Sequence, residues 1–116
     1  MTSFISSFLK NRPNVQNLDA ENFKEKLEKN ENAVLLDVRT PQEYHDVRIP
    51  NSINLDLMDP YFIHEIEKLD KSKSYYIYCR SGNRSYYACM EMLKLGFTEV
   101  YNLADGIIGW NGELER

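Results

Sequence analysis

The sequence predicts an α/β fold in which a parallel sheet lies between layers of helices. Apolar runs of strand length alternate along the chain with amphipathic segments of helical period. The run 33–38 is almost continuously apolar, which is typical of a strand that is covered on both faces of a parallel sheet, and the run 75–78 is a further apolar stretch of strand type. The chain has 116 residues, close to the commonest length of a single domain. We therefore predict one folded domain over residues 14–116, preceded by an N-terminal extension over residues 1–13.

Short apolar runs between turn residues or polar residues predict the strands. They lie at residues 14–18, 33–38, 53–55, 75–78 and 99–102. In the second run the one polar residue, Asp37, stands near the C-terminal end. Ligands of parallel sheets bind at the carboxyl ends of the strands, so polar residues at these ends are candidates for a functional site.

Capping residues predict the first two helices. Asp19 stands in the N-cap position of a helix over residues 20–29, whose apolar residues share one face at i, i+4 spacing. Thr40, Pro41 and Glu43 have the pattern of a capping box with proline at the first helical position. We expect the first to be a surface helix and the second to be short.

Apolar residues at helical spacing predict two further helices. The pair Asp59-Pro60 has the pattern of a helix start, and the apolar stripe after it consists of Phe62, Ile63, Ile66 and Leu69. The last predicted helix covers residues 85–95 and ends at Gly96, because glycine is the usual residue just after a helix.

The composition limits the partners of the protein. A net charge of −4 and a pI of about 5.2 disfavour nucleic acid and anionic lipid as main partners. No apolar run approaches the roughly 20 residues that a membrane helix requires. Lys10 and Arg12 follow an apolar stretch that serines interrupt, whereas a secretory signal places its positive charge first. We therefore expect a cytoplasmic protein that binds neither nucleic acid nor membrane.

The cysteines and histidines do not form a metal-binding pattern. Cys79 and Cys89 lack C-x-x-C spacing and have no histidines at metal-ligand distances, so we predict no metal site, no disulfide and no cofactor. Cys89 lies beside the apolar stripe of the last predicted helix, and we interpret it as a small core residue. We interpret His45 and His64 as solvent-exposed surface residues.

The segment that follows the strand at 75–78 has the features of an activated cysteine. A cysteine reacts as its thiolate, and the ordinary thiol pKa of about 8.5 falls where the local potential is positive. Arg80 and Arg84 bring positive charge close to Cys79. The helix start beyond them adds unpaired N–H groups and the positive end of the helix dipole. Each of these features favours a Cys79 thiolate.

The interior of the same segment favours a tight loop. Gly82 and Asn83 belong to the residue types that best tolerate a positive φ. Successive N–H groups of such a loop can converge on one anion. We therefore predict Cys79 as the catalytic nucleophile, and as the residues that bind the substrate Arg80, Ser81, Gly82, Asn83, Arg84 and Ser85.

Several segments form an ordered set of landmarks along the chain: Leu36–Arg39, Glu43-Tyr44, Ile49–Asn54, the Cys79 loop, Gly96-Phe97 and Leu103–Trp110. In order and spacing they resemble the landmarks of the rhodanese (thiosulfate sulfurtransferase) domain, and the resemblance covers about residues 15–112. It implies a three-layer domain with a central five-stranded parallel sheet flanked by helices. It also implies that Cys79 carries sulfur as a persulfide, and that Arg80 and Arg84 stand at basic positions associated with a thiosulfate-type anion.

The chain departs from the pattern of this family at two places. It has Val47–Ser52 where Gly-His-Ile-Pro-Gly-Ala is frequent, and Asp105-Gly106 where a glycine pair is common. Both departures lie outside the cysteine loop, so they bear on the surroundings of the substrate more than on the chemistry.

Three further residues have alternative interpretations. Asp37 and Arg39 follow the end of a predicted strand, where they either orient the cysteine loop as supporting site residues or form a structural ion pair. Both roles stay open at this point. We expect Trp110 to pack in the core against the last helix.

The loop and the resemblance together predict a sulfurtransferase. A small anionic sulfur donor such as thiosulfate would transfer its sulfane sulfur to Cys79, and cyanide, a thiol or a protein would accept it. Two alternatives are a rhodanese-like module that only binds and a persulfide carrier for a protein partner. A cysteine phosphatase or arsenate reductase is a minor alternative, because these enzymes place five residues between cysteine and arginine, whereas four lie between Cys79 and Arg84.

Overall fold

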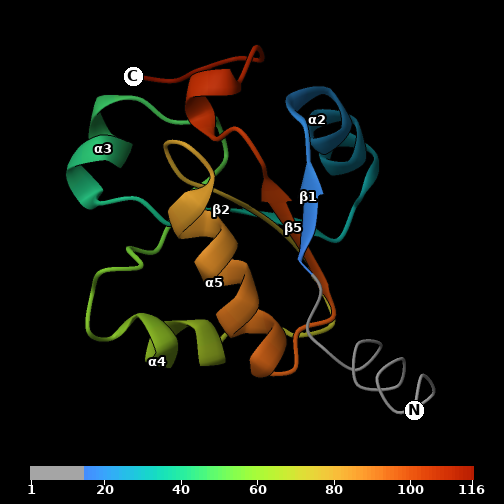
Figure 1. The fold of residues 1–116 in the computed structure, drawn as a ribbon, viewed down its shortest axis with the longest axis vertical. Coiled ribbons are helices and arrows are strands. Elements are labelled where there is room, and N and C mark those ends of the chain that lie inside the picture. The colour runs from blue at the N-terminus through green and yellow to red at the C-terminus, as the bar shows by residue number, and fades with distance from the viewer. Residues whose placement is uncertain (1–14) are drawn as a thin grey trace, which may run out of the picture.

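The computed structural model describes residues 15–116, so the extension predicted for residues 1–13 lies outside the described part of the chain (Figure 1). One parallel sheet has the strand order β1-β5-β4-β2-β3. Its strands are β1 (Gln16–Leu18), β2 (Ala33–Asp37), β3 (Ile53–Asn54), β4 (Ser74–Tyr78) and β5 (Glu99–Leu103). The helices are α2 (Ala20–Lys29), α3 (Pro41–Asp46), α4 (Phe62–Glu67), α5 (Asn83–Lys94) and the short 3-10 helix η1 (Ile107–Gly109).

The sheet lies between two apolar layers, which confirms the predicted three-layer α/β fold. Figure 1 shows α2 on one side of the strands and α4 and α5 on the other. Along β4, Tyr75 and Ile77 pack in the layer with α4 and α5, while Tyr76 and Tyr78 pack in the layer with α2. Every residue of β4 is buried, because this strand lies in the middle of the sheet and is covered on both faces.

The local capping signals act as the sequence predicts. The Asp19 carboxylate accepts a hydrogen bond from the Asn22 N–H at 2.8 Å, and α2 begins at the next residue. At α3, Thr40 and Glu43 form both hydrogen bonds of a capping box. The helix after Thr40 therefore begins where the carboxyl end of β2 requires a turn, next to the end of β4.

The prediction for the third helix, the one expected after Asp59-Pro60, is wrong at its start. The Asp59 carboxylate accepts a hydrogen bond from the Tyr61 N–H at 2.8 Å, so it closes a turn and does not cap the helix. Helix α4 begins at Phe62, three residues after Asp59. With this start Phe62 and Ile66 face the core, whereas Ile63, expected on the apolar stripe, is 38% exposed.

The last long helix, by contrast, begins earlier than predicted. Helix α5 starts at Asn83, two residues before the predicted start at residue 85, because Gly82 takes the N-cap position with a φ of 97°. The cysteine loop is shortened by the same two residues, and the first turn of α5 becomes part of the site.

We expect the centre of β2 to be a stability determinant. Leu36 is fully buried between β3 and β4, so Leu36→Ala should destabilise the fold by about 3 kcal/mol through lost burial and a cavity. Met58, at 71% exposed, provides a control, and Met58→Ala should change the stability by less than about 0.5 kcal/mol. Urea unfolding followed by tyrosine fluorescence measures both, and equal losses would contradict this description of the core.

Candidate active site

Cys79 lies directly after β4, at the carboxyl edge of the sheet, where the sequence places it. Its Sγ accepts hydrogen bonds from the Gly82 N–H at 3.2 Å, the Ser85 N–H at 3.4 Å and the Ser85 hydroxyl at 3.3 Å. The cysteine is only 1% exposed, and Ser85 is fully buried behind it. The loop and the first turn of α5 thus surround the sulfur atom with donors, as expected for an anion-binding loop.

The donors around Sγ decide the direction of the pKa shift of Cys79. Burial is the largest single influence, and it favours the neutral thiol. The Ser85 hydroxyl and the N–H groups of Ser85, Gly82 and Ser81 act in the opposite direction, and together they hold the pKa of Cys79 below its ordinary value. The thiolate is therefore favoured by fixed dipoles that lie within hydrogen-bond distance.

The segment after β5 fixes the backbone of the cysteine loop. The Ile107 N–H donates to the Cys79 carbonyl at 2.9 Å, and the Ile108 N–H donates to the Arg80 carbonyl at 3.2 Å. Gly106 makes this approach possible, since a Cβ at this position would lie 2.1 Å from the Arg80 carbonyl oxygen. The Asp105-Gly106 pair, a departure from the family pattern, therefore retains glycine at the position where the contact requires it.

Gly82 contacts both the Cys79 sulfur, through its N–H, and Asn102 of β5, through its carbonyl. Its φ of 97° is unfavourable for a side chain, and a Cβ here would lie 2.0 Å from the Ala104 carbonyl oxygen. The Asn102 amide donates to the Gly82 carbonyl at 3.2 Å and to the Asn17 side-chain oxygen at 2.9 Å. Asn102 of β5 therefore holds the peptide that follows the N–H donor of Gly82, and it fixes the backbone of the loop on the C-terminal side of this donor.

Sequence reasoning missed Asn102 as a site residue. It belongs to the predicted strand 99–102 and is 1% exposed. A polar residue at the carboxyl end of a buried strand was the available signal, and the same signal led to Asp37.

The loop arginines differ in their surroundings. The Arg84 guanidinium forms a two-pronged ion pair with Glu43, with N–O distances of 2.8 and 2.9 Å. The Glu43 carboxylate also accepts from the Thr40 N–H and hydroxyl, so it belongs to the capping box of α3 at the same time. In residues 15–116 the exposed Arg80 side chain has neither a hydrogen bond nor an ion pair.

The ion pair holds Glu43 ionised. The hydrogen bond from Arg84 is the main influence that lowers the pKa of Glu43 to about 2, with a smaller contribution from Thr40, and burial opposes both. Arg84 therefore meets a negative charge at any pH near neutrality. Sequence reasoning found Glu43 as a capping residue and missed it as a neighbour of the cysteine loop.

Asp37 and Arg39 form a buried ion pair. The Arg39 guanidinium donates to the Asp37 carboxylate at 2.7 to 3.1 Å and to the Val47 carbonyl at 2.6 Å. Its charge also lies over the ring of Tyr78 at 5.5 Å. Across the described part of the chain, neither side chain bonds to residues 79–85. Arg39 contacts the ring of Tyr78, the residue before the cysteine, and the charge of Asp37 acts through space on Arg84 of the loop.

The remaining candidates lie away from the sulfur atom. Cys89 is fully buried in the core, and burial raises the pKa of its thiol. His45 and His64 are exposed on helices, as expected. The prediction for Trp110 is wrong in its partner, because the ring packs edge-to-face on Phe23 of α2 at 6.0 Å and not on α5.

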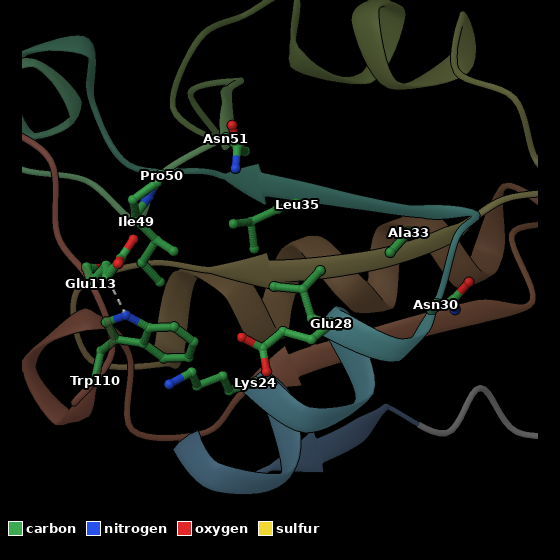
Figure 2. Close-up of a pocket in the computed structure, with 11 residues that line it drawn as sticks. Lys24, Glu28, Asn30, Ala33, Leu35, Ile49, Pro50, Asn51, Trp110 and Glu113 are labelled. Atoms are coloured by element: carbon green, nitrogen blue, oxygen red, sulfur yellow. Dashed lines mark hydrogen bonds between the residues drawn. The ribbon is translucent and has the colours of Figure 1, made fainter.

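Trp110 helps to line a separate groove of about 480 Å³ (Figure 2). Leu35 and Ile49 form part of its floor, and Lys24 and Glu28 reach it from α2. None of residues 79–85 lines this groove. It lies on the α2 side of the sheet, so we do not assign it to the chemistry of Cys79.

The described residues contain neither a metal-binding cluster nor a membrane-spanning element. Between residues 15 and 116, no three histidine, cysteine, aspartate or glutamate side chains are placed to hold a metal ion. In the same part of the chain, every helix is too short or too polar to cross a bilayer.

Comparisons with known proteins show the family of the chain. The model of the rhodanese-like domain family matches residues 19–113. A sulfurtransferase from Allochromatium vinosum is 38% identical over 97 residues, which cover 83% of this chain and 88% of that protein. The putative sulfur carrier protein YrkF from Bacillus subtilis is 34% identical over 109 residues, which cover 90% of this chain and 56% of that longer protein.

A solved structure shows the same arrangement of strands and helices. The rhodanese-like domain protein from Staphylococcus aureus aligns with a TM-score of 0.72 at 26% identity, over 87% of this chain and 97% of that one. An α/β sheet with a cysteine in a loop of N–H donors at its carboxyl edge defines the class of the protein. The chain belongs to the rhodanese-like domain family.

The hydroxyl of Ser85 should control the ionisation of Cys79. Ser85→Ala removes a donor to the thiolate, so the pKa of Cys79 should rise and its alkylation should require higher pH. The rate of iodoacetamide labelling against pH, with the site located by mass spectrometry, measures the change. Ser81→Ala is the control, because Ser81 lowers the pKa of Cys79 only through its backbone N–H, which alanine retains. The labelling curve of this variant should match that of the wild type. Identical curves for Ser85→Ala and wild type would contradict the role of the hydroxyl.

The two glycines with φ near 100° should differ in their tolerance of alanine. Gly82→Ala adds a clash with the Ala104 carbonyl to the backbone strain and should cost about 3 kcal/mol or more. Gly96→Ala meets only the Lys71 side chain, at 3.8 Å, and should cost about 1–2 kcal/mol from the strain alone. Urea unfolding of both variants measures these losses of stability. Equal losses for Gly82→Ala and Gly96→Ala would contradict the close approach of the cysteine loop to Ala104.

Proposed function

We propose that the protein is a sulfurtransferase that carries sulfane sulfur on Cys79 as a persulfide. The donor is thiosulfate or a similar compound, and the acceptor is cyanide, a thiol or a protein. The observation that carries this proposal is the set of N–H and O–H donors around the Cys79 sulfur. They favour the thiolate that attacks the donor, and they favour the persulfide anion that replaces it.

The reaction has two steps. The Cys79 thiolate attacks the outer sulfur of thiosulfate, the S–S bond of the donor breaks, and its electron pair leaves with sulfite. Cys79 then carries one additional sulfur atom and one negative charge. A nucleophile such as cyanide attacks that sulfur, and the Cys79 thiolate is the leaving group, so no external oxidant or reductant is needed. The positions of Arg80, Ser81, Asn83 and Arg84 around the loop support a role in donor binding.

The length of the loop supports sulfur transfer over phosphoryl transfer. Four residues separate Cys79 from Arg84, and the donors of Gly82 and Ser85 lie within 3.4 Å of Sγ. A phosphoryl group needs a ring of donors around a tetrahedral anion, and Arg84 is engaged with Glu43. These features disfavour the phosphatase alternative.

A protein acceptor is supported by the apolar surface beside the loop. Ile108 is 66% exposed, and its N–H bonds to the Arg80 carbonyl. Tyr86 and Tyr87 in the first turns of α5 are 41% and 55% exposed. Exposed apolar groups next to a reactive atom suit contact with a macromolecule. We extend the proposal to a persulfide carrier for a protein partner, in a compartment such as the cytoplasm that keeps thiols reduced.

Mass spectrometry after treatment with thiosulfate, without reductant, tests the proposed function. We expect a gain of about 32 Da on Cys79, the mass of one sulfur atom, and its loss on addition of cyanide. Cys89→Ser should retain the adduct, because Cys89 is buried in the core. Cys79→Ser should abolish it.

Three other outcomes would overturn the proposal. The absence of an adduct with thiosulfate and with other sulfane donors would exclude a persulfide route. Hydrolysis of an aryl phosphate that depends on Cys79 would favour the phosphatase. Full biological activity of Cys79→Ser would favour a module that only binds.

A further inference from the structure

The Glu43–Arg84 ion pair changes the charge of the site that a sulfur donor meets. The cysteine loop contains two arginines, and Glu43 neutralises one of them through two hydrogen bonds, at 2.8 and 2.9 Å. Both side chains are only about one third exposed, at 30% and 28%, so water screens the pair incompletely. Within residues 15–116, Arg80 is then the only loop arginine without an ionic partner.

Glu43 is also held in place by its own helix. Its carboxylate accepts from the Thr40 N–H and hydroxyl, both at 3.1 Å, while its N–H donates to Thr40 at 3.2 Å. A donor whose oxygens bind Arg84 therefore meets a guanidinium whose charge is already paired, and the two N–H groups directed at Glu43 become available only if this carboxylate leaves the capping box. Its pKa of about 2 keeps Glu43 charged under all ordinary conditions.

The charge of the sulfur donor determines how strongly the Glu43–Arg84 ion pair weakens the binding of that donor. Thiosulfate is a dianion whose three oxygens require cationic partners, and it also feels the negative charge of Glu43. An organic persulfide, R–S–SH, has no sulfonate oxygens at the reacting end and carries at most one negative charge on its sulfur chain. The pairing of Arg84 therefore penalises thiosulfate much more than a persulfide.

We propose that Glu43 is a specificity-determining residue that directs Cys79 toward organic persulfides as sulfur donors and away from thiosulfate. This inference rests on the proposed sulfur transfer through Cys79. In the preferred reaction the Cys79 thiolate attacks the outer sulfur of R–S–SH. The S–S bond of the donor breaks, its electron pair leaves on R–S⁻, and Cys79 becomes Cys79–S–SH, so atoms and charge balance.

The capping box provides a selective probe of this role. Glutamine at the third helical position can also accept the capping hydrogen bonds, so Glu43→Gln retains the start of α3, while it removes the charge that neutralises Arg84 and the oxygen that accepts its second hydrogen bond. Thr40→Ala does the reverse, because it removes the capping hydroxyl and leaves the ion pair. The two variants separate a loss of helix stability from a change of charge at the site.

The experiment compares the rates of persulfide formation on Cys79 with thiosulfate and with cysteine persulfide, in single-turnover reactions followed by mass spectrometry. For Glu43→Gln we expect the rate with thiosulfate to rise roughly tenfold and the rate with cysteine persulfide to change less than about twofold. The gain with thiosulfate should fall as the salt concentration rises, because it is electrostatic. Thr40→Ala should leave the ratio of the two rates unchanged.

A double variant links the gain to Arg84. In Glu43→Gln/Arg84→Gln the freed guanidinium is absent, so the gain with thiosulfate should disappear, as a double-mutant cycle requires. Equal ratios for wild type and Glu43→Gln, or a gain that persists in the double variant, would refute the role of Glu43. If the wild-type protein accepts sulfur from neither donor, the proposed function itself fails, and this outcome is distinct from an unchanged ratio.

Discussion

The close approach of two backbone segments is the constraint on which the site depends. The cysteine loop and the segment 104–108 after β5 are in direct contact, with hydrogen bonds to the carbonyls of Cys79 and Arg80. Only glycine fits at Gly82 and Gly106, because a Cβ at either position would lie about 2 Å from a carbonyl oxygen of the other segment. This contact directs the N–H of Gly82 toward Sγ, and the parallel pairing of β4 with β5 brings the two segments to the same edge of the sheet.

The thiolate is stabilised mainly by dipoles and less by the nearby arginines. The hydroxyl of Ser85 and three backbone N–H groups lower the pKa of Cys79 against the effect of burial. Arg84 is neutralised by Glu43, and the side chain of Arg80 is exposed to solvent on a protein whose net charge is negative. Fixed dipoles serve a sulfur that is an anion both before and after transfer, since they need not move between the two states. The charged groups are then available to select the donor.

Capping signals and strand patterns were reliable where the interaction is local. Asp19 and Thr40 cap their helices with side chains that reach only three residues along the chain, so the sequence suffices to place α2 and α3. The start of α4 could not be placed in this way. Asp59 has two local options, a turn or a cap, and the burial of Phe62 and Ile66 against the sheet decides between them.

The sequence by itself determined the α/β class, the position of Cys79 after a buried strand and the loop of donors around it. These features follow from periodicity, residue type and spacing, which act over a few residues. Only the tertiary structure showed that Asn102 binds the Gly82 carbonyl and that Glu43 neutralises Arg84. These partners lie 20 and 41 residues apart in the chain. A parallel sheet brings its carboxyl ends together regardless of such separations, so contacts across that edge depend on strand order and register, which short-range patterns do not contain.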